Sequence, residues 1–369
     1  MTHPLLEKLY KAMDASKLDS IVINPGPTLS YLTGLSFHIS ERPVVIFFTP
    51  GKDPAIILPD LETPKLGHTP FEMQAFPYSE LPGEWPKAFE KGIQAHRIKN
   101  KSIGMEPRAL RILEYLFIKQ AAPEAAFTDA SEALASLRIT KNSDEIAKMR
   151  RATMIAQDAL KACLPLIKIG MSEKELAAEL TIQLLRNGSS PEIPFSPIIA
   201  SGPNSANQHA TPTDRKLQAG DMLVIDWGAA FDGYISDLTR TFAIGEVNAE
   251  AKRIYKIVQE AAEAGRAAGK PGVPCAEVDK AARNVIEKAG YGVYFNSRTG
   301  HGIGMEVHEN PYMRGDNLQI LEPGMCYTVE PGIYIPDRHG VRIEDDMVVT
   351  ESGVESMSDM QREFQVIGK

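Results

Sequence analysis

Two stretches of equal length decide how the second part of this chain folds: KIGMSEKELAAELTIQLLRNG (residues 168–188) and KPGVPCAEVDKAARNVIEKAG (residues 270–290). They align without a gap, 102 positions apart, and Glu175 matches Glu277. Ser172 and Glu175 have the spacing of a helix capping box, and each closing glycine suits a left-handed helix end. Chance similarity between two amphipathic helices is common. The equal length, and an alanine-rich helix before each copy, favour a duplication that places a site between its halves.

Short β-branched runs follow each copy: MLVIDWGA and TFAI after the first, MCYTVEPGIYI and VRIEDDMVVT after the second. Before the copies, residues 4–14 have helical spacing of apolar side chains, and IVIN, VVIFF and AIILP read as strands. The character of the sequence changes near residue 135, where a charged segment leads into a predicted long amphipathic helix capped at Asn142 or Ser143. We therefore predict a mixed α/β (α+β) chain with two domains, residues 1–134 and residues 135–369.

Composition excludes several classes of protein. The 369 residues carry a formal charge of −8, which offers no attraction to nucleic acid or to an anionic membrane. No run approaches eighteen apolar residues, and the charged start lacks the apolar core of a signal peptide. Three widely spaced cysteines argue against a disulfide scaffold and against a thiolate zinc site. We expect a cytoplasmic protein that binds neither nucleic acid nor membranes.

Five potential metal ligands stand inside or at the ends of apolar, strand-like runs. They are Asp226 in LVIDWGA, Asp237 in YISDLTRT, His301 in GHGIGMEVHE, Glu330 in YTVEPGIYIP and Glu344 in GVRIEDD. Each alone is explained as a turn residue, a helix cap or a strand end. Together they imply four carboxylates buried without matching arginines, which is very costly unless cations balance them. Two divalent ions about 3.5–4 Å apart do so and activate a shared water, and oxygen-rich ligation with one imidazole suits manganese, cobalt or iron.

These blocks resemble, in order, the signatures of the creatinase/methionine-aminopeptidase superfamily, peptidase family M24. The N-terminal part, with NPGPTLSYLTGL, is similar to the creatinase-type domain of prolidases and aminopeptidases P, so the resemblance covers nearly the whole chain. It implies an N-terminal creatinase-type α/β domain followed by a pseudo-twofold "pita-bread" catalytic domain. It also implies that the five residues above bind two divalent metals, Mn(II) first, with Co(II), Fe(II) and Zn(II) as alternatives.

The resemblance assigns further roles. Glu330 is expected to be the general base, and His209 and His308 to stabilise the oxyanion or protonate the leaving nitrogen; without the family, either histidine is equally well explained as a satisfied loop residue. We predict that Arg342 orients the carboxylates by a charge-assisted contact. The remaining candidates are an apolar wall for proline made of Tyr234, Ile303 and Tyr312, and His38 with Phe37 reaching a neighbouring chain of a homodimer.

A full N-terminal domain favours a peptidase that cleaves the Xaa-Pro bond of proline-containing dipeptides or short peptides over a methionine aminopeptidase. Dipeptidase and aminopeptidase P both stay open, because Tyr312 stands where some dipeptidases carry an arginine. Two other classes are a non-peptidase hydrolase or lyase on the same fold, such as a creatinase-like amidinohydrolase, and an inactive binding module. Creatinases and the inactive modules have lost metal ligands, and all five are intact here.

Overall fold

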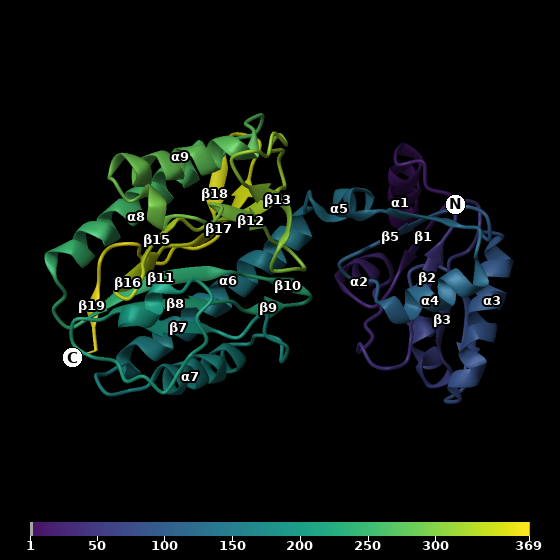
Figure 1. Ribbon diagram of the computed structural model, residues 1–369, viewed down its shortest axis with the longest axis horizontal. Coiled ribbons are helices and arrows are strands. Elements are labelled where there is room, and N and C mark those ends of the chain that lie inside the picture. The colour runs from purple at the N-terminus through teal and green to yellow at the C-terminus, as the bar shows by residue number, and fades with distance from the viewer. Residues whose placement is uncertain (1–2, 369) are drawn as a thin grey trace. The chain divides into compact units, whose positions relative to one another are not determined.

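The computed structural model describes residues 3–368 and divides into two compact units, Met1–Arg138 and Ile139–Lys369. Both units contain helices and strands, which confirms the predicted mixed α/β class (Figure 1). The three cysteines are buried and free. Of the helices described, none is long and apolar enough to cross a lipid bilayer.

The first unit is a six-stranded sheet covered on both faces. Its elements are α1 (Pro4–Ala15), β1 (Ser20–Ile23), α2 (Pro27–Thr33), β2 (Val45–Phe48), β3 (Ala55–Pro59), η1 (Asp60–His68), β4 (Gln74–Tyr78), η2 (Pro82–Glu84), α3 (Trp85–His96), β5 (Ser102–Met105), α4 (Ile112–Ala121), β6 (Ala126–Asp129) and α5 (Ser131–Arg138). The strand order is β4-β3-β2-β1-β5-β6. Alternation along β1 sends Ile21 and Ile23 into a core with α1, α2 and α5, and Val22 into a second core with α3 and α4.

The second unit holds the duplicated stretches. Its elements are α6 (Ser143–Cys163), η3 (Leu164–Leu166), α7 (Glu173–Arg186), β7 (Ile198–Ser201), η4 (Gly202–Ala206), β8 (Met222–Trp227), β9 (Ala230–Phe231), β10 (Tyr234–Ile235), β11 (Leu238–Ile244), α8 (Ala249–Ala268), α9 (Cys275–Lys288), η5 (Gly292–Tyr294), β12 (Gly300–Gly302), β13 (Glu309–Met313), β14 (Cys326–Val329), β15 (Gly332–Ile335), β16 (His339–Arg342), β17 (Asp345–Val349), β18 (Val354–Ser356) and β19 (Val366–Ile367).

The two copies fold alike. Helices α7 and α9 begin and end at matched positions of the two stretches. Gly170 and Gly272 both have φ +85°, a left-handed conformation that favours glycine, and their N–H groups donate to Leu217 O and Leu321 O, each at 2.9 Å. The copies differ at the helix start, since Ser172 forms the predicted capping box whereas Pro274 caps α9 without a side-chain bond.

Two largely antiparallel sheets, in which only β11 and β19 pair in parallel among the described strands, build the second unit with helices outside them. One sheet has the strand order β19-β11-β8-β7 and packs against α6 and α7. The other has the order β13-β12-β14-β17-β18 and contacts α8 and α9. Figure 1 shows α8 and α9 (green) and α7 (teal) on opposite sides of the strands. An isolated antiparallel bridge between Thr239 and Glu344 joins β11 to the residue before β17. The two halves therefore meet at the residues predicted to bind metal.

Candidate metal centre

Strand ends from both halves bring the five predicted ligands together. Asp226 lies in β8, and Asp237 directly precedes β11. His301 lies in β12, Glu330 follows β14, and Glu344 precedes β17. Thr239 connects the two halves at this point, because it pairs with Asp226 across the β8–β11 ladder and with Glu344 across the isolated bridge.

The ligand atoms of Asp237, His301 and Glu344 all lie within 4.8 Å of one another, and all three residues are buried. His301 Nε2 is 3.2 Å from Glu330 Oε1 and 3.8 Å from Asp237 Oδ2. A cavity of about 200 Å³ opens onto this cluster. Its lining consists of Phe195, Ile198, Gln208, His209, Asp226, Asp237, His301, Val307, His308, Glu330, Arg342 and Glu344.

The carboxylates of this cluster are held in an unfavourable electrostatic setting. Burial, followed by repulsion from neighbouring carboxylates, raises the pKa of Asp237 and of Glu344 well above the ordinary value. Burial also raises the pKa of Asp226, although Arg342 opposes it. Burial acts on Glu330 in the same direction, but the hydrogen bond and charge of His301, together with the charges of Arg342 and Arg298, outweigh it and leave the pKa of Glu330 lowered.

The donor set fits divalent metal. Asp226 Oδ1, Asp237 Oδ1 and Glu344 Oε1 are buried and have no hydrogen-bond partner among the described residues. Buried polar atoms are almost always paired, so three such oxygens around one imidazole indicate a site suited to a cation. Hard oxygen donors with a single nitrogen are ligands that manganese, iron or cobalt ions prefer. A structural zinc site would instead use thiolate ligands.

Arg342 contacts the carboxylate of Asp226, and its role as an orienting residue stays a prediction. Its Nη2 donates to Asp226 Oδ2 at 2.5 Å, and its Nε donates to Thr239 Oγ1 at 2.9 Å. Thr239 Oγ1 in turn donates to Glu344 Oε2 at 2.6 Å. One guanidinium and one hydroxyl thus fix two of the carboxylates, leaving one oxygen of each for a metal.

The two other predicted histidines line the same cavity and are exposed to solvent. The His308 ring lies edge-on against the ring of His301, with 4.2 Å between centroids. His308 is followed by Glu309, which forms a buried ion pair with Lys141 at 2.5 Å. That pair anchors the start of β13 and with it the backbone that carries His308.

The other predicted residues lie elsewhere. Tyr234 donates to Glu145 Oε1 at 2.5 Å, and with Ile303 it belongs to a hydrophobic cluster that does not line the cavity. Tyr312 pairs with His301 across the β12–β13 ladder, and its ring contacts Arg298. His38, which is exposed, and the buried Phe37 belong to the first unit.

Several residues at the site were not found from the sequence. Phe195, Ile198 and Val307 form the apolar part of the lining, and Gln208 adds an amide. Phe195, Val307 and Gln208 lie in loops and Ile198 begins β7, and such positions carry no periodic pattern that aims them at a site. Thr239 was recognisable in principle, because residues two apart on a strand share a face and Asp237 was already a candidate.

Removing bound metal is expected to make stability fall as pH rises. Burial raises the pKa of Asp346, beside this cluster, to about 8, and the pKa values of Asp237 and Glu344 are also raised. A carboxyl with a raised folded-state pKa contributes stability below its unfolded value, about 4, and loses it as pH rises through the folded value. Thermal unfolding of EDTA-treated protein from about pH 5 to 8.5 measures how the unfolding midpoint changes with pH. Added Mn(II) should remove most of that pH dependence. A midpoint that rises with pH in the metal-free protein contradicts the expectation.

Comparison with known proteins places these features in context. The profile of "Metallopeptidase family M24" matches residues 147–351, and that of "Creatinase/Prolidase N-terminal domain" matches residues 6–140. An Xaa-Pro dipeptidase of Lactobacillus helveticus is 34% identical over 363 residues, 98% of each chain. A solved prolidase of Thermococcus sibiricus is 31% identical with a TM-score of 0.94, over 100% of both chains. A solved dipeptidase of Pyrococcus horikoshii is 35% identical with a TM-score of 0.92, covering 98% of this chain and 100% of that one.

Proposed function

The chain belongs to metallopeptidase family M24, and from this premise we propose that it hydrolyses the bond before proline in Xaa-Pro dipeptides. The observation that carries the proposal is the cluster of buried carboxylates around His301, three of whose oxygens have no partner in the described part of the chain. Relatives named Xaa-Pro dipeptidase and prolidase, similar over nearly the full length, support the substrate class.

We propose Asp226, Asp237, His301, Glu330 and Glu344 as the ligands of two divalent metal ions, with Mn(II) resident. When bound, such ions polarise a carbonyl and lower the pKa of coordinated water. Elemental analysis of the purified protein measures their identity and number. We also propose a cytoplasmic protein, as expected from its composition, and a homodimer, as the family resemblance implies; sedimentation velocity should then give about 81 kDa, twice the 40.5 kDa of one chain.

The chain's own residues have distinct tasks in this proposal. Glu330, whose pKa is lowered, is ionised at neutral pH and can accept a proton from the attacking water. His209 and His308 line the cavity from its solvent side, where an imidazole N–H can reach the scissile carbonyl oxygen or the leaving nitrogen. The bond before proline is a tertiary amide without an N–H, so its ring needs an apolar wall rather than an acceptor. We assign that wall to Phe195, Ile198 and Val307.

We propose Arg298 as the group that meets the carboxylate of a dipeptide. Its guanidinium lies over the ring of Tyr312, with 4.8 Å to the centroid, and a stacked guanidinium keeps its N–H donors free at the edge. Arg298 is also close enough to Glu330 to lower its pKa, and the adjacent Asn296 side chain accepts from Gln208 of the cavity lining at 2.7 Å. An arginine near an acidic cavity suits a free carboxylate.

Arg298→Met is expected to lower kcat/KM for Ala-Pro by roughly 10- to 100-fold, the usual effect of losing a hydrogen bond to a charged group. Ala-Pro amide, which lacks the carboxylate, should be hydrolysed slowly by the native protein and be little affected by the substitution. Release of alanine in the presence of Mn(II) measures both. Arg314→Met, which removes an exposed arginine paired with Asp316, serves as the control.

The outcomes separate the two parts of the proposal. No release of alanine from Ala-Pro, Gly-Pro or Ala-Pro-Ala, with Mn(II) or Co(II), rejects the Xaa-Pro substrate class. Equal turnover of Ala-Pro and its amide by the native protein rejects only the role of Arg298. Faster turnover of Ala-Pro-Ala than of Ala-Pro would mark an aminopeptidase instead of a dipeptidase.

A further inference from the structure

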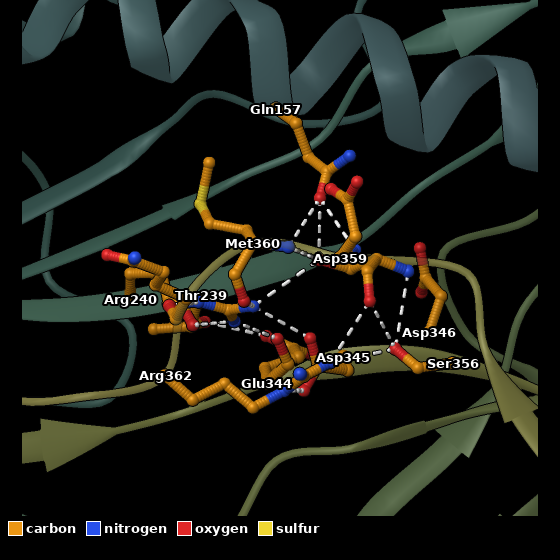
Figure 2. A network of polar contacts seen from close by, with 12 residues as sticks. Gln157, Thr239, Arg240, Glu344, Asp345, Asp346, Ser356, Asp359, Met360 and Arg362 are labelled. Atoms are coloured by element: carbon orange, nitrogen blue, oxygen red, sulfur yellow. Dashed lines mark hydrogen bonds and ion pairs between the residues drawn. The ribbon is translucent and has the colours of Figure 1, made fainter.

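Arg240 lies directly behind the candidate metal centre, on the opposite face of strand β11. Successive side chains of a strand point to opposite faces, so Thr239 and Thr241 face the carboxylates whereas Arg240 points away from them. Thr241 Oγ1 donates to Arg342 O at 2.8 Å on the site face. Arg240 is only 2% exposed, and Figure 2 shows it within a network of polar contacts. An arginine this deeply buried needs a partner for every donor.

One nitrogen of Arg240 binds both backbones that cross at the site. Its Nη1 donates to Thr239 O at 2.9 Å and to Glu344 O at 2.6 Å. Glu344 N donates to Thr239 O at 3.1 Å at the same crossing. These two segments carry the ligands Asp237 and Glu344. Arg240 therefore fixes the register between the strand that presents one carboxylate and the strand that presents another.

The remaining donors of Arg240 are held by Asp345 and by segment 356–363. Nη2 donates to Asp345 Oδ1 at 2.8 Å and to Met360 O at 3.0 Å, and Nε donates to Gln361 O at 2.9 Å. Every side of the guanidinium is thus fixed. The segment that supplies these carbonyls lies beyond residues 147–351, the part of the chain that matches the family profile.

Two helices in turn hold segment 356–363. Gln157 Oε1, on α6, accepts from Ser358 Oγ, Asp359 N and Met360 N at 2.9, 3.0 and 2.9 Å (Figure 2). Tyr255 OH, on α8, donates to the carbonyls of residues 362 and 363, both at 3.0 Å. The guanidinium is consequently tied to both helix layers of the second unit.

We propose that Arg240 is a positioning residue for the metal centre, held in place by Asp345 and segment 356–363. This inference rests on the proposed metal ligands, Asp237 and Glu344. Arg240 contacts neither carboxylate and acts through the backbone that carries them. Partners that orient metal ligands in this indirect way commonly affect metal affinity by roughly 10- to 100-fold.

A second reading, in which Arg240 is only a buried charge, predicts the opposite sign. Three guanidinium groups surround the Asp345 carboxylate, those of Arg240, Arg266 and Arg362. Removing one positive charge near four carboxylates should strengthen cation binding by Coulomb's law. Loosening the register between the backbone segments at Thr239 and Glu344 should instead weaken cation binding. The sign of the change in affinity therefore separates positioning from charge.

Arg266 offers the matched control. It contacts the same carboxylate, with Nη1 3.3 Å from Asp345 Oδ2. Within the described part of the chain, however, it forms no hydrogen bond with the backbone at Thr239 or Glu344. Co(II) titration of the metal-free protein, followed by calorimetry and visible absorption, measures affinity and ligand geometry. We expect Arg240→Met to bind Co(II) about 10- to 100-fold more weakly than the native protein, and Arg266→Met to bind it equally or more tightly.

Hydrogen exchange gives a readout that needs no metal. The Glu344 amide, bonded to Thr239 O, should exchange faster in metal-free Arg240→Met than in metal-free Arg266→Met. Arg240→Lys keeps the charge but cannot span both carbonyls and Asp345, so it should share the weakened binding and the faster exchange. If Arg240→Met does not fold, Arg240→Lys carries the test.

Equal Co(II) affinity and equal Glu344 exchange in the Arg240 and Arg266 variants would overturn the positioning role. Tighter Co(II) binding by Arg240→Met would overturn it in favour of the charge reading. Failure of the native protein to bind Co(II) at all would instead reject the assigned metal ligands, and with them the proposed function.

Discussion

Asp237→Asn should abolish peptide hydrolysis, with kcat/KM at least about 10³-fold lower, or roughly 4 kcal/mol of lost transition-state stabilisation. The amide keeps the size of the side chain but removes the negative charge that the proposed metal site requires. A ligand atom of Asp237 lies within 4.8 Å of those of His301 and Glu344, so the substitution removes a charged oxygen from the centre of the cluster. His301→Ala should have a comparable effect, because it removes the one imidazole of the ligand set.

The same substitution should stabilise the metal-free protein. Burial and neighbouring carboxylates raise the pKa of Asp237 well above its ordinary value, so its charged form is unfavourable at neutral pH. A neutral amide removes that cost. Loss of activity together with a higher unfolding midpoint in EDTA is therefore the expected pair of results. The control is Asp232→Asn, which alters an exposed aspartate paired with Lys148. Retained turnover in Asp237→Asn would mean that the ligand is misassigned.

Asp345→Asn is expected to destabilise the second unit by about 3–5 kcal/mol, the usual cost of removing one partner from a buried ionic cluster. Asp345 is fully buried, and Arg240 and Arg362 approach it at 2.8 and 2.6 Å. Those arginines lower the pKa of Asp345 against the effect of burial, which shows that its charged form is favoured. A neutral amide would leave buried guanidinium groups without a counter-charge. Urea and thermal unfolding measure the loss.

Asp359→Asn is the matched control for this prediction. Its side chain is exposed, and its backbone N–H donates to Gln157 in the same network. The substitution should change stability by less than about 0.5 kcal/mol, as surface substitutions usually do. A similarly small change in Asp345→Asn would show that the arginines find other partners.

The sequence was most informative where a local pattern alone determines structure. The duplicated stretches became α7 and α9 with matched bounds, α7 has its predicted capping box, and Asn142, one of the two caps expected for α6, begins that helix. The structure brings Asp226, Asp237, His301, Glu330 and Glu344 to one cavity, and their roles as ligands stay a prediction. Carboxylates in apolar strands are informative because burial without a partner is so costly.

Several features that depend on contacts far apart in the chain were not predicted. Tyr234 and Ile303 were expected at the substrate wall, but the hydroxyl of Tyr234 is drawn to Glu145, 89 residues away. The Arg240–Asp345 pair spans 105 residues and has no signal beyond a charged residue inside an apolar strand. Which of several acidic residues meets a buried arginine depends on topology, and a single sequence does not specify it.

The crossing of Thr239 and Glu344 also determines when the metal centre can form during synthesis. Glu344 follows Thr239 by 105 residues, and Gln361, which holds Arg240, follows it by 121 residues. At roughly 5–20 residues per second, a ribosome needs about 6–24 s to add those 121 residues. For most of that interval the nascent chain carries Asp226 and Asp237 without the full set of proposed ligands from the second half, because Glu344 is the last of them to be added. The proposed ligand set is therefore complete only after the addition of residue 344, and Arg240 gains its last hydrogen-bond partners only after that of residue 361.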